Sequence, residues 1–241
     1  MTIEHFNLTH ILVIIGMPLL IFLSIYFSLA KHDEKIKRKV LLLLCGFNAV
    51  LYVAYMIAHV VDPNFHFEIL NNLPLHFCNI NLVLIPLAIL TRNKTLMAYQ
   101  VYFGFPLATV ALIVVYPLFL STSILEFKTF TYFFYHSVLV VLPILLVKFR
   151  IFTPSFKIIW QPTVLLLTLT LIAHIINVTF RATGLSSEAN YFFTHGLDGD
   201  FFTEFFWSIV PFNFFFLLPA LLLFAPYIFV ITFIFRNRDQ K

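Results

Sequence analysis

Seven long apolar stretches alternate with short polar segments along the chain, and each one is long enough to form a membrane-spanning helix. A helix needs about 20 residues to cross a hydrocarbon core of about 30 Å. Charged side chains are absent from the interior of the stretches, where one charge costs at least ~2.5 kcal/mol. The expected spans are residues 8–30, 40–61, 75–91, 96–116, 130–149, 157–179 and 207–235. The pattern therefore predicts an all-α bundle of seven transmembrane helices.

Composition supports this class, because 61% of the residues are hydrophobic, 11% are charged and 32 are phenylalanine. Such a composition is typical of an integral membrane protein. The net charge of +4 is spread over polar segments and forms no basic stripe, so no nucleic-acid partner is expected. The first apolar run lacks a basic n-region and a cleavage site, which favours a retained helix. We expect a single transmembrane domain over residues 1–241.

Lysine and arginine indicate how the bundle is oriented, since positive charge collects in cytoplasmic loops. Basic residues follow the first, third and fifth expected spans and end the chain: Lys31, Lys35, Lys37, Arg38, Lys39, Arg92, Lys94, Lys148, Arg150, Lys157, Arg236, Arg238 and Lys241. Only Lys128 and Arg181 fall on the opposite side. Most acids share that side: Glu4, Asp62, Glu68, Glu126, Glu188, Asp198, Asp200 and Glu204. The N-terminus is therefore predicted outside and the C-terminus in the cytoplasm.

The two cysteines are predicted to be separate thiols. With this topology Cys45 lies near the inner end of its span and Cys78 near the outer end of the next. At the rise of a helix they are roughly 15–20 Å apart in depth, too far for a disulfide. Cys45 sits among leucines and has the character of a buried apolar residue.

Uncharged polar side chains gather near the outer ends of five spans, whereas the inner half offers little beyond Asn48 and Gln100. The outer layer contains His59, His76, Cys78, Asn79, Asn81, His136, His174, Asn177 and Asn213. Hydrogen bonds between helices, worth about 0.6 kcal/mol each, are the ordinary explanation for any one of these residues. A site that opens toward the outer leaflet explains why they share one depth.

Helical spacing suggests partners within this layer. Cys78 and Asn81 are three residues apart and share a face, as do His174 and Asn177. His76 lies on nearly the opposite side from Cys78, unless Pro74 leaves the first turn irregular. A base for the thiol would then come from another helix, from His136 or His174. An imidazole can take the thiol proton, and an asparagine amide can orient the imidazole or donate to an oxyanion.

The segment from Leu73 to Asn81, LPLHFCNIN, resembles the YwaF-like bacterial membrane proteins and the related animal transmembrane protein 164 family. The likeness covers nearly the whole chain: Gly104 with Pro106, Tyr135 to Ser137, and the His174 to Asn177 patch recur in the same order. The animal member is regarded as a cysteine-dependent phospholipid acyltransferase. The resemblance implies that Cys78 accepts an acyl group as a thioester. It does not decide between His136 and His174 as the general base, and of these two we prefer His136. It also implies a bacterial cytoplasmic membrane, a phospholipid or lysolipid substrate and no cofactor.

Three alternatives remain open from the sequence. A small-molecule or ion transporter normally carries intramembrane acids or broken helices; the spans hold no acid, although Pro106, Pro143 and Pro219 could break helices. A zinc hydrolase could use His59, His136 and His174 as ligands, but no paired ligand motif is present. A non-catalytic seven-helix protein is the third alternative; a retinal pigment is disfavoured because the last span has no lysine. The segment of residues 180–206 is longer than a connection needs and could cover an outward-facing site.

Overall fold

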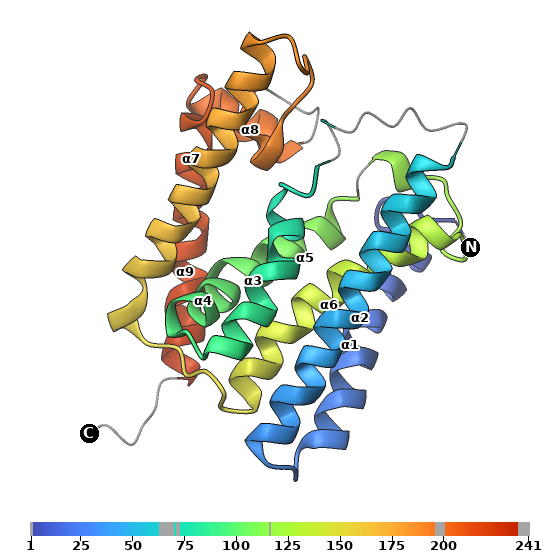
Figure 1. The fold of residues 1–241 in the computed structure, drawn as a ribbon, viewed down its shortest axis with the longest axis vertical. Coiled ribbons are helices and arrows are strands. Elements are labelled where there is room, and N and C mark those ends of the chain that lie inside the picture. Colours follow the sequence, from blue (N-terminus) through green and yellow to red (C-terminus); the bar gives the residue numbers. More distant parts are fainter. Residues whose placement is uncertain (1, 63–69, 71–72, 116, 196–200, 236–241) are drawn as a thin grey trace. The chain divides into compact units, whose positions relative to one another are not determined.

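The computed structural model describes residues 2–62, 70, 73–115, 117–195 and 201–235, and the described chain is helical throughout (Figure 1). The α-helices are α1 (Leu8–Leu29), α2 (Glu34–Val60), α3 (Phe77–Thr91), α4 (Lys94–Tyr99), α5 (Phe105–Ile113), α6 (Phe127–Lys148), α7 (Trp160–Ala182), α8 (Phe201–Ile209) and α9 (Leu218–Phe235). A π-helix, η1 (Gln100–Gly104), joins α4 to α5. Short 3₁₀ turns are η2 (Pro117–Phe119), η3 (Phe156–Ile158), η4 (Tyr191–Phe193) and η5 (Phe215–Leu217).

Six helical segments of the described chain are long and apolar enough to cross a membrane. They are Leu8–Leu29, Glu34–Val60, Lys94–Ile113, Phe127–Lys148, Phe156–Ala182 and Phe215–Phe235. The expected third span corresponds to α3, whose 15 residues give a length of about 22 Å against a core of about 30 Å. The all-helical fold and the multi-pass membrane class are confirmed, whereas the seventh span stays a prediction.

The orientation of the termini and the single-domain organisation also stay predictions. Several residues that entered the orientation argument lie outside the described residues: Glu68, Asp198, Asp200, Arg236, Arg238 and Lys241. The described chain groups into two compact units, one of residues 1–66 and 81–153 and one of residues 67–80 and 154–241.

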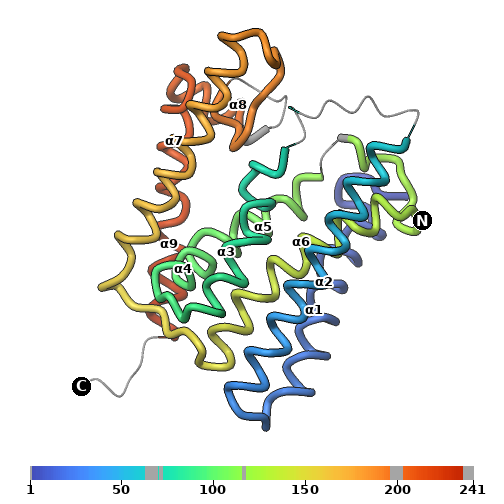
Figure 2. Tube along the Cα trace, viewed as in Figure 1, coloured from blue at the N-terminus to red at the C-terminus, as the bar shows by residue number. Residues whose placement is uncertain are grey.

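The first unit is built around α6, which packs against α1, α2 and α5 (Figure 2). Most of α6 is buried, and Val138, Leu142 and Leu145 are almost fully enclosed. Pro143 lies within this helix without ending it. In a bilayer such packing rests on close contact between side chains, since lipid tails are as apolar as leucine. The long apolar face of α6 therefore packs against protein rather than lipid.

The helix α2 begins at Glu34, earlier than the expected span of residues 40–61. The carboxylate of Asp33 accepts a hydrogen bond from the Ile36 N–H at 2.8 Å and caps the first turn. Polar residues can remain helical outside the hydrocarbon core, so the apolar stretch marks only the buried part of the helix. The helix and its membrane-crossing segment therefore have different ends.

The π-helix η1 replaces an α-helical turn in the middle of the expected span of residues 96–116. Pro106 follows it and has no N–H to donate to the turn before it. The side chain of Gln100 is fully buried and donates from Nε2 to Oδ1 of Asn81 at 2.9 Å. A Cβ on Gly104 would lie 2.6 Å from Oε1 of Gln100, so only glycine leaves room for this amide.

From the sequence, Asn81 is expected near the outer end of its span and Gln100 in the inner half. The hydrogen bond between their side chains instead places the two residues at similar depth. Asn81 lies about ten residues before the turn between α3 and α4, and Gln100 about seven residues after it, so the difference in rise is only about 5 Å. The two amide side chains cover that distance. Asn81 therefore joins two helices, which is the ordinary role of a polar residue in a span.

In the second unit, the expected continuous span of residues 207–235 is wrong, because the helix is interrupted between α8 and α9. Pro211 removes one backbone donor at the break. The N–H of Phe212 donates to the carbonyl of Val210, and Phe214 adopts a positive φ of 67°. The remaining helix α9 has 18 residues, and η5 precedes it.

Candidate functional site

Cys78 lies in the first turn of α3 as a half-buried, free thiol. His76 precedes the helix, and its carbonyl accepts hydrogen bonds from the N–H groups of Asn79 and Ile80, both at 3.0 Å. His76 therefore stands at the start of α3 rather than inside it. The His76 carbonyl thus already accepts from two N–H groups at the start of α3, and the helix dipole favours negative charge at this end of the helix.

Aromatic contacts hold the beginning of α3 against η4 within the second unit. The ring of His76 lies 5.4 Å from that of Tyr191 and 5.6 Å from that of Phe193. The ring of Phe77 lies 5.8 Å from that of Phe192. Phe192 and Phe193 both have positive φ values, 57° and 55°, a conformation that costs a bulky residue energy and needs support from its surroundings.

That support comes from Asn177 on α7, which holds η4 through three hydrogen bonds. The Tyr191 N–H donates to Oδ1 of Asn177 at 2.9 Å. Nδ2 of Asn177 donates to the Tyr191 carbonyl and to Oγ1 of Thr194, both at 2.8 Å. Asn177, Tyr191 and Thr194 are completely buried. Residues 191–194 are thereby bound to α7, and a covering role for the longer segment of residues 180–206 stays a prediction.

Replacing Asn177 by leucine is expected to destabilise the protein by about 2–4 kcal/mol, because it leaves buried polar groups without partners. The Tyr191 N–H and carbonyl both lose their partner in this variant. The measurement is denaturant or thermal unfolding in detergent. Thr168→Val on the same helix is the control, since its hydroxyl bonds only to the Val164 carbonyl and is exposed. Equal stability of the two variants would contradict this role of Asn177.

His174 extends the same network by one step. Its Nδ1 lies 3.1 Å from Oγ1 of Thr194, the hydroxyl that already accepts a proton from Asn177. A hydroxyl has one proton to donate, and Nδ1 of His174 is the acceptor within reach. The neutral imidazole then carries its proton on Nε2, so His174 is arranged as a hydrogen-bond donor.

The ring of His195 is stacked on His174, with ring centres 6.4 Å apart. Burial, with a smaller contribution from the charge of Arg181, lowers the pKa of His195 below its ordinary value. A lowered pKa keeps this imidazole uncharged at pH 7. His195 therefore adds no positive charge beside His174 at that pH.

The two predicted site histidines of the first unit, His59 and His136, have the opposite arrangement. Nδ1 of His136 lies 2.8 Å from the Tyr132 carbonyl, and Nδ1 of His59 lies 3.0 Å from the Tyr55 carbonyl. A carbonyl can only accept, so Nδ1 carries the proton and Nε2 keeps a lone pair in each neutral ring. A lone pair on Nε2 is what a general base requires.

The structure divides the predicted site residues between the two units. The second unit contains His76, Cys78, Asn79, His174, Asn177 and Asn213, and the first contains His59, Asn81 and His136. The pairing of Cys78 with His136 therefore stays a prediction, as does the common depth of the polar layer. Asn213 lies in the break before α9, where its carbonyl accepts from the Phe215 N–H at 2.8 Å.

Three contributors to the second-unit network were not expected from the sequence: Tyr191, Thr194 and His195. All three belong to the segment of residues 180–206, whose length was the only signal that it does more than connect two helices. Residues 196–200 of that segment lie outside the described residues. Within the described part of the chain, no group of three His, Cys, Asp or Glu side chains is placed to hold a metal ion.

The six long apolar helices define the class of this molecule as a multi-pass helical membrane protein. The sequence model of the TMEM164 family matches residues 2–235, and the chain belongs to this family. A comparison with the curated proteins finds no match. A comparison with the solved structures finds none either.

Proposed function

We propose that this protein transfers acyl groups between membrane lipids, or from a lipid to water, through a thioester on Cys78. The observation that carries the proposal is the place of Cys78, a free thiol in the first turn of α3. It directly follows His76 and Phe77, whose rings contact the η4 segment that Asn177 binds. Membership of the TMEM164 family supports it. The activity and its lipid substrate are proposals.

The reaction would take place in two steps. The Cys78 thiolate attacks an ester carbonyl of a phospholipid, a C–S bond forms, and the C–O bond to the glycerol breaks. The lysolipid alcohol leaves with a proton from the conjugate acid of the base. A lysolipid hydroxyl or a water then loses its proton to the base and attacks the thioester, which restores the thiol.

Each group has a role that its surroundings favour. Nε2–H of His174 is a donor suited to a developing oxyanion. His136 remains the predicted base, because the Tyr132 carbonyl fixes its proton on Nδ1 and leaves Nε2 able to accept one. Its placement against Cys78 is part of the proposal.

The test is intact-mass spectrometry of the purified protein after incubation with phospholipid vesicles. An increase equal to one acyl group, removed by hydroxylamine and mapped to the peptide that contains Cys78, is the expected result. An unmodified protein after conditions that allow lysolipid to form, or an adduct mapped only to Cys45, would refute the thioester. In that case the small-molecule or ion transporter becomes the leading alternative.

A further inference from the structure

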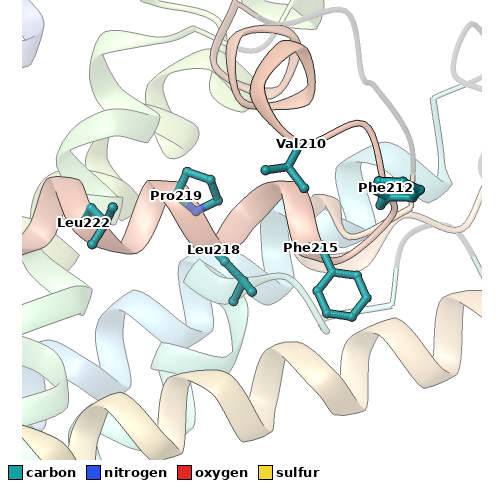
Figure 3. Close-up of a pocket in the computed structure, with 6 residues that line it drawn as sticks. All are labelled: Val210, Phe212, Phe215, Leu218, Pro219 and Leu222. Carbon is teal, nitrogen blue, oxygen red and sulfur yellow. The ribbon is translucent and has the colours of Figure 1, made fainter.

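The interruption before α9 creates an apolar hollow of about 470 Å³. It is lined by Val210, Phe212, Phe215, Leu218, Pro219 and Leu222. Figure 3 shows Val210 and Phe212 on the segment that leaves α8, with the other four along the beginning of the last span. Every lining side chain is apolar, and the volume falls within the ~300–1,000 Å³ of ordinary small-molecule sites.

Backbone strain maintains this hollow. The N–H of Phe215 donates to the Asn213 carbonyl at 2.8 Å around Phe214, whose φ of 67° and ψ of −52° define a γ-turn of the strained kind. Such a conformation persists only where the surrounding structure supports it. The Phe214 N–H donates to the Thr194 carbonyl at 2.8 Å, which supplies that support. The hollow is therefore a defined feature of the fold rather than a chance gap along a smooth helix.

The same turn connects the hollow with the polar network. The ring of Phe214 lies 5.3 Å from the ring of His174. Its neighbours Phe212 and Phe215 line the hollow and expose 65% and 54% of their surfaces. One side of the turn thus meets an imidazole arranged as a donor, and the other side meets an open apolar surface.

We propose that this hollow, the 210–222 hollow, binds one acyl chain of a bilayer lipid. Lipid is the occupant because the hollow begins the membrane-spanning segment Phe215–Phe235 and has no polar lining group to recognise anything else. Bound there, the chain brings its ester group to the side of Phe214 where His174 lies. The proposal rests on the proposed function only for that last step, since chain binding requires no chemistry.

The experiment uses the full-length Cys78→Ala protein in phosphatidylcholine vesicles that contain a lipid with a photoreactive group in its acyl chain. Removing the thiol separates binding from reaction. After illumination, the crosslinked lipid is mapped by peptide mass spectrometry. The expected result is enriched labelling of the peptide that covers residues 210–222, compared with peptides from exposed faces of α1.

Two variants make the test specific. Leu218→Trp places a large ring in the hollow and is expected to abolish the enrichment. Leu223→Trp is the matched control: this residue is 57% exposed on the same helix, does not line the hollow, and should leave the labelling unchanged. Size-exclusion profiles and melting curves identify a variant that has lost its fold. The comparison of the 210–222 peptide with the α1 peptides, made in the protein whose hollow is unaltered, needs neither variant.

Labelling spread evenly over all spans, or enrichment that survives Leu218→Trp, would overturn the proposal. Crosslinks between two copies of the chain at residues 210–222 would overturn it as well, because a second protein would then occupy the hollow. Enriched labelling without any acyl adduct on Cys78 in the unsubstituted protein would retain the hollow and reject the proposed function. An acyl adduct on Cys78 without enriched labelling of residues 210–222 would retain the proposed function and reject the hollow as the site of the acyl chain.

Discussion

Cys78→Ala is expected to abolish both the acyl adduct and turnover, because no second group in the proposed reaction can carry the thioester. The fall in rate should be on the order of 10⁴-fold or more, as when the nucleophile of a catalytic unit is removed. The measurement combines intact mass with chromatographic analysis of lysolipid and transferred acyl chains. Because Cys78 is only half-buried on α3, the variant is expected to keep its fold, and a melting curve checks this point.

The chain provides a matched control in its other cysteine. Cys45 is buried in α2, and Cys45→Ala is expected to keep the adduct and the turnover of the unaltered protein. Cys78→Ser adds a second check, since an oxygen ester formed on serine would resist the hydroxylamine treatment that cleaves a thioester. An adduct of unchanged abundance in Cys78→Ala would reject the assignment of the nucleophile.

The second large effect concerns the two histidines, which should respond differently to glutamine. The amide of glutamine can donate a hydrogen bond near the position of Nε2 but cannot accept a proton. His136→Gln is therefore expected to slow acylation by roughly 10²–10⁴-fold, the usual contribution of a general base. His174→Gln should keep most of the rate. The bond with Thr194 leaves the Nε2–H group of His174 as a donor, and glutamine also supplies a donor.

His174→Leu removes the donor and is expected to cost roughly 10²–10³-fold, comparable to the loss of one oxyanion donor. Rates of adduct formation, measured by intact mass at a fixed lipid concentration, distinguish these cases. If His136→Gln reacts at the full rate while His174→Gln is inactive, the roles are exchanged and His174 is the base. His59→Gln serves as the comparison, since its Nδ1 makes the same kind of bond to a carbonyl one turn before it.

The positions of the six long apolar helices follow from the sequence, because the length of an apolar stretch is set by the bilayer. Their ends do not follow so directly. Pro18, Pro86 and Pro143 lie inside helices α1, α3 and α6, whereas Pro211 accompanies a complete break. A proline alone cannot distinguish the two outcomes, since neighbouring side chains in a bundle can compensate for the missing donor. The break depends on the bond from Phe214 to Thr194, which no local pattern contains.

The polar site likewise contains residues that the sequence identifies and residues that only the structure reveals. Cys78 stands out in the sequence through its motif and its chemistry. Thr194 and Tyr191 became visible only in the structure, because their partner Asn177 lies well before them in the chain and the segment must fold back to meet it. Helical spacing identifies neighbours three and four residues apart, and it carries no information about a folded connection. His174 could be proposed from the sequence, but the position of its proton could not.

The π-helix η1 also affects how this chain can be aligned and probed. A π-turn accommodates one more residue than the α-helical turn it replaces, and one residue corresponds to about 100° of rotation about a helix axis. A helical wheel drawn continuously from Lys94 to Ile113 would therefore assign the wrong faces to α5. A single-residue deletion within Gln100–Gly104 would restore an α-helical turn and leave the residues after it on their present faces. Crosslinking pairs on α5 are best chosen from the structure, with the count restarted at Phe105.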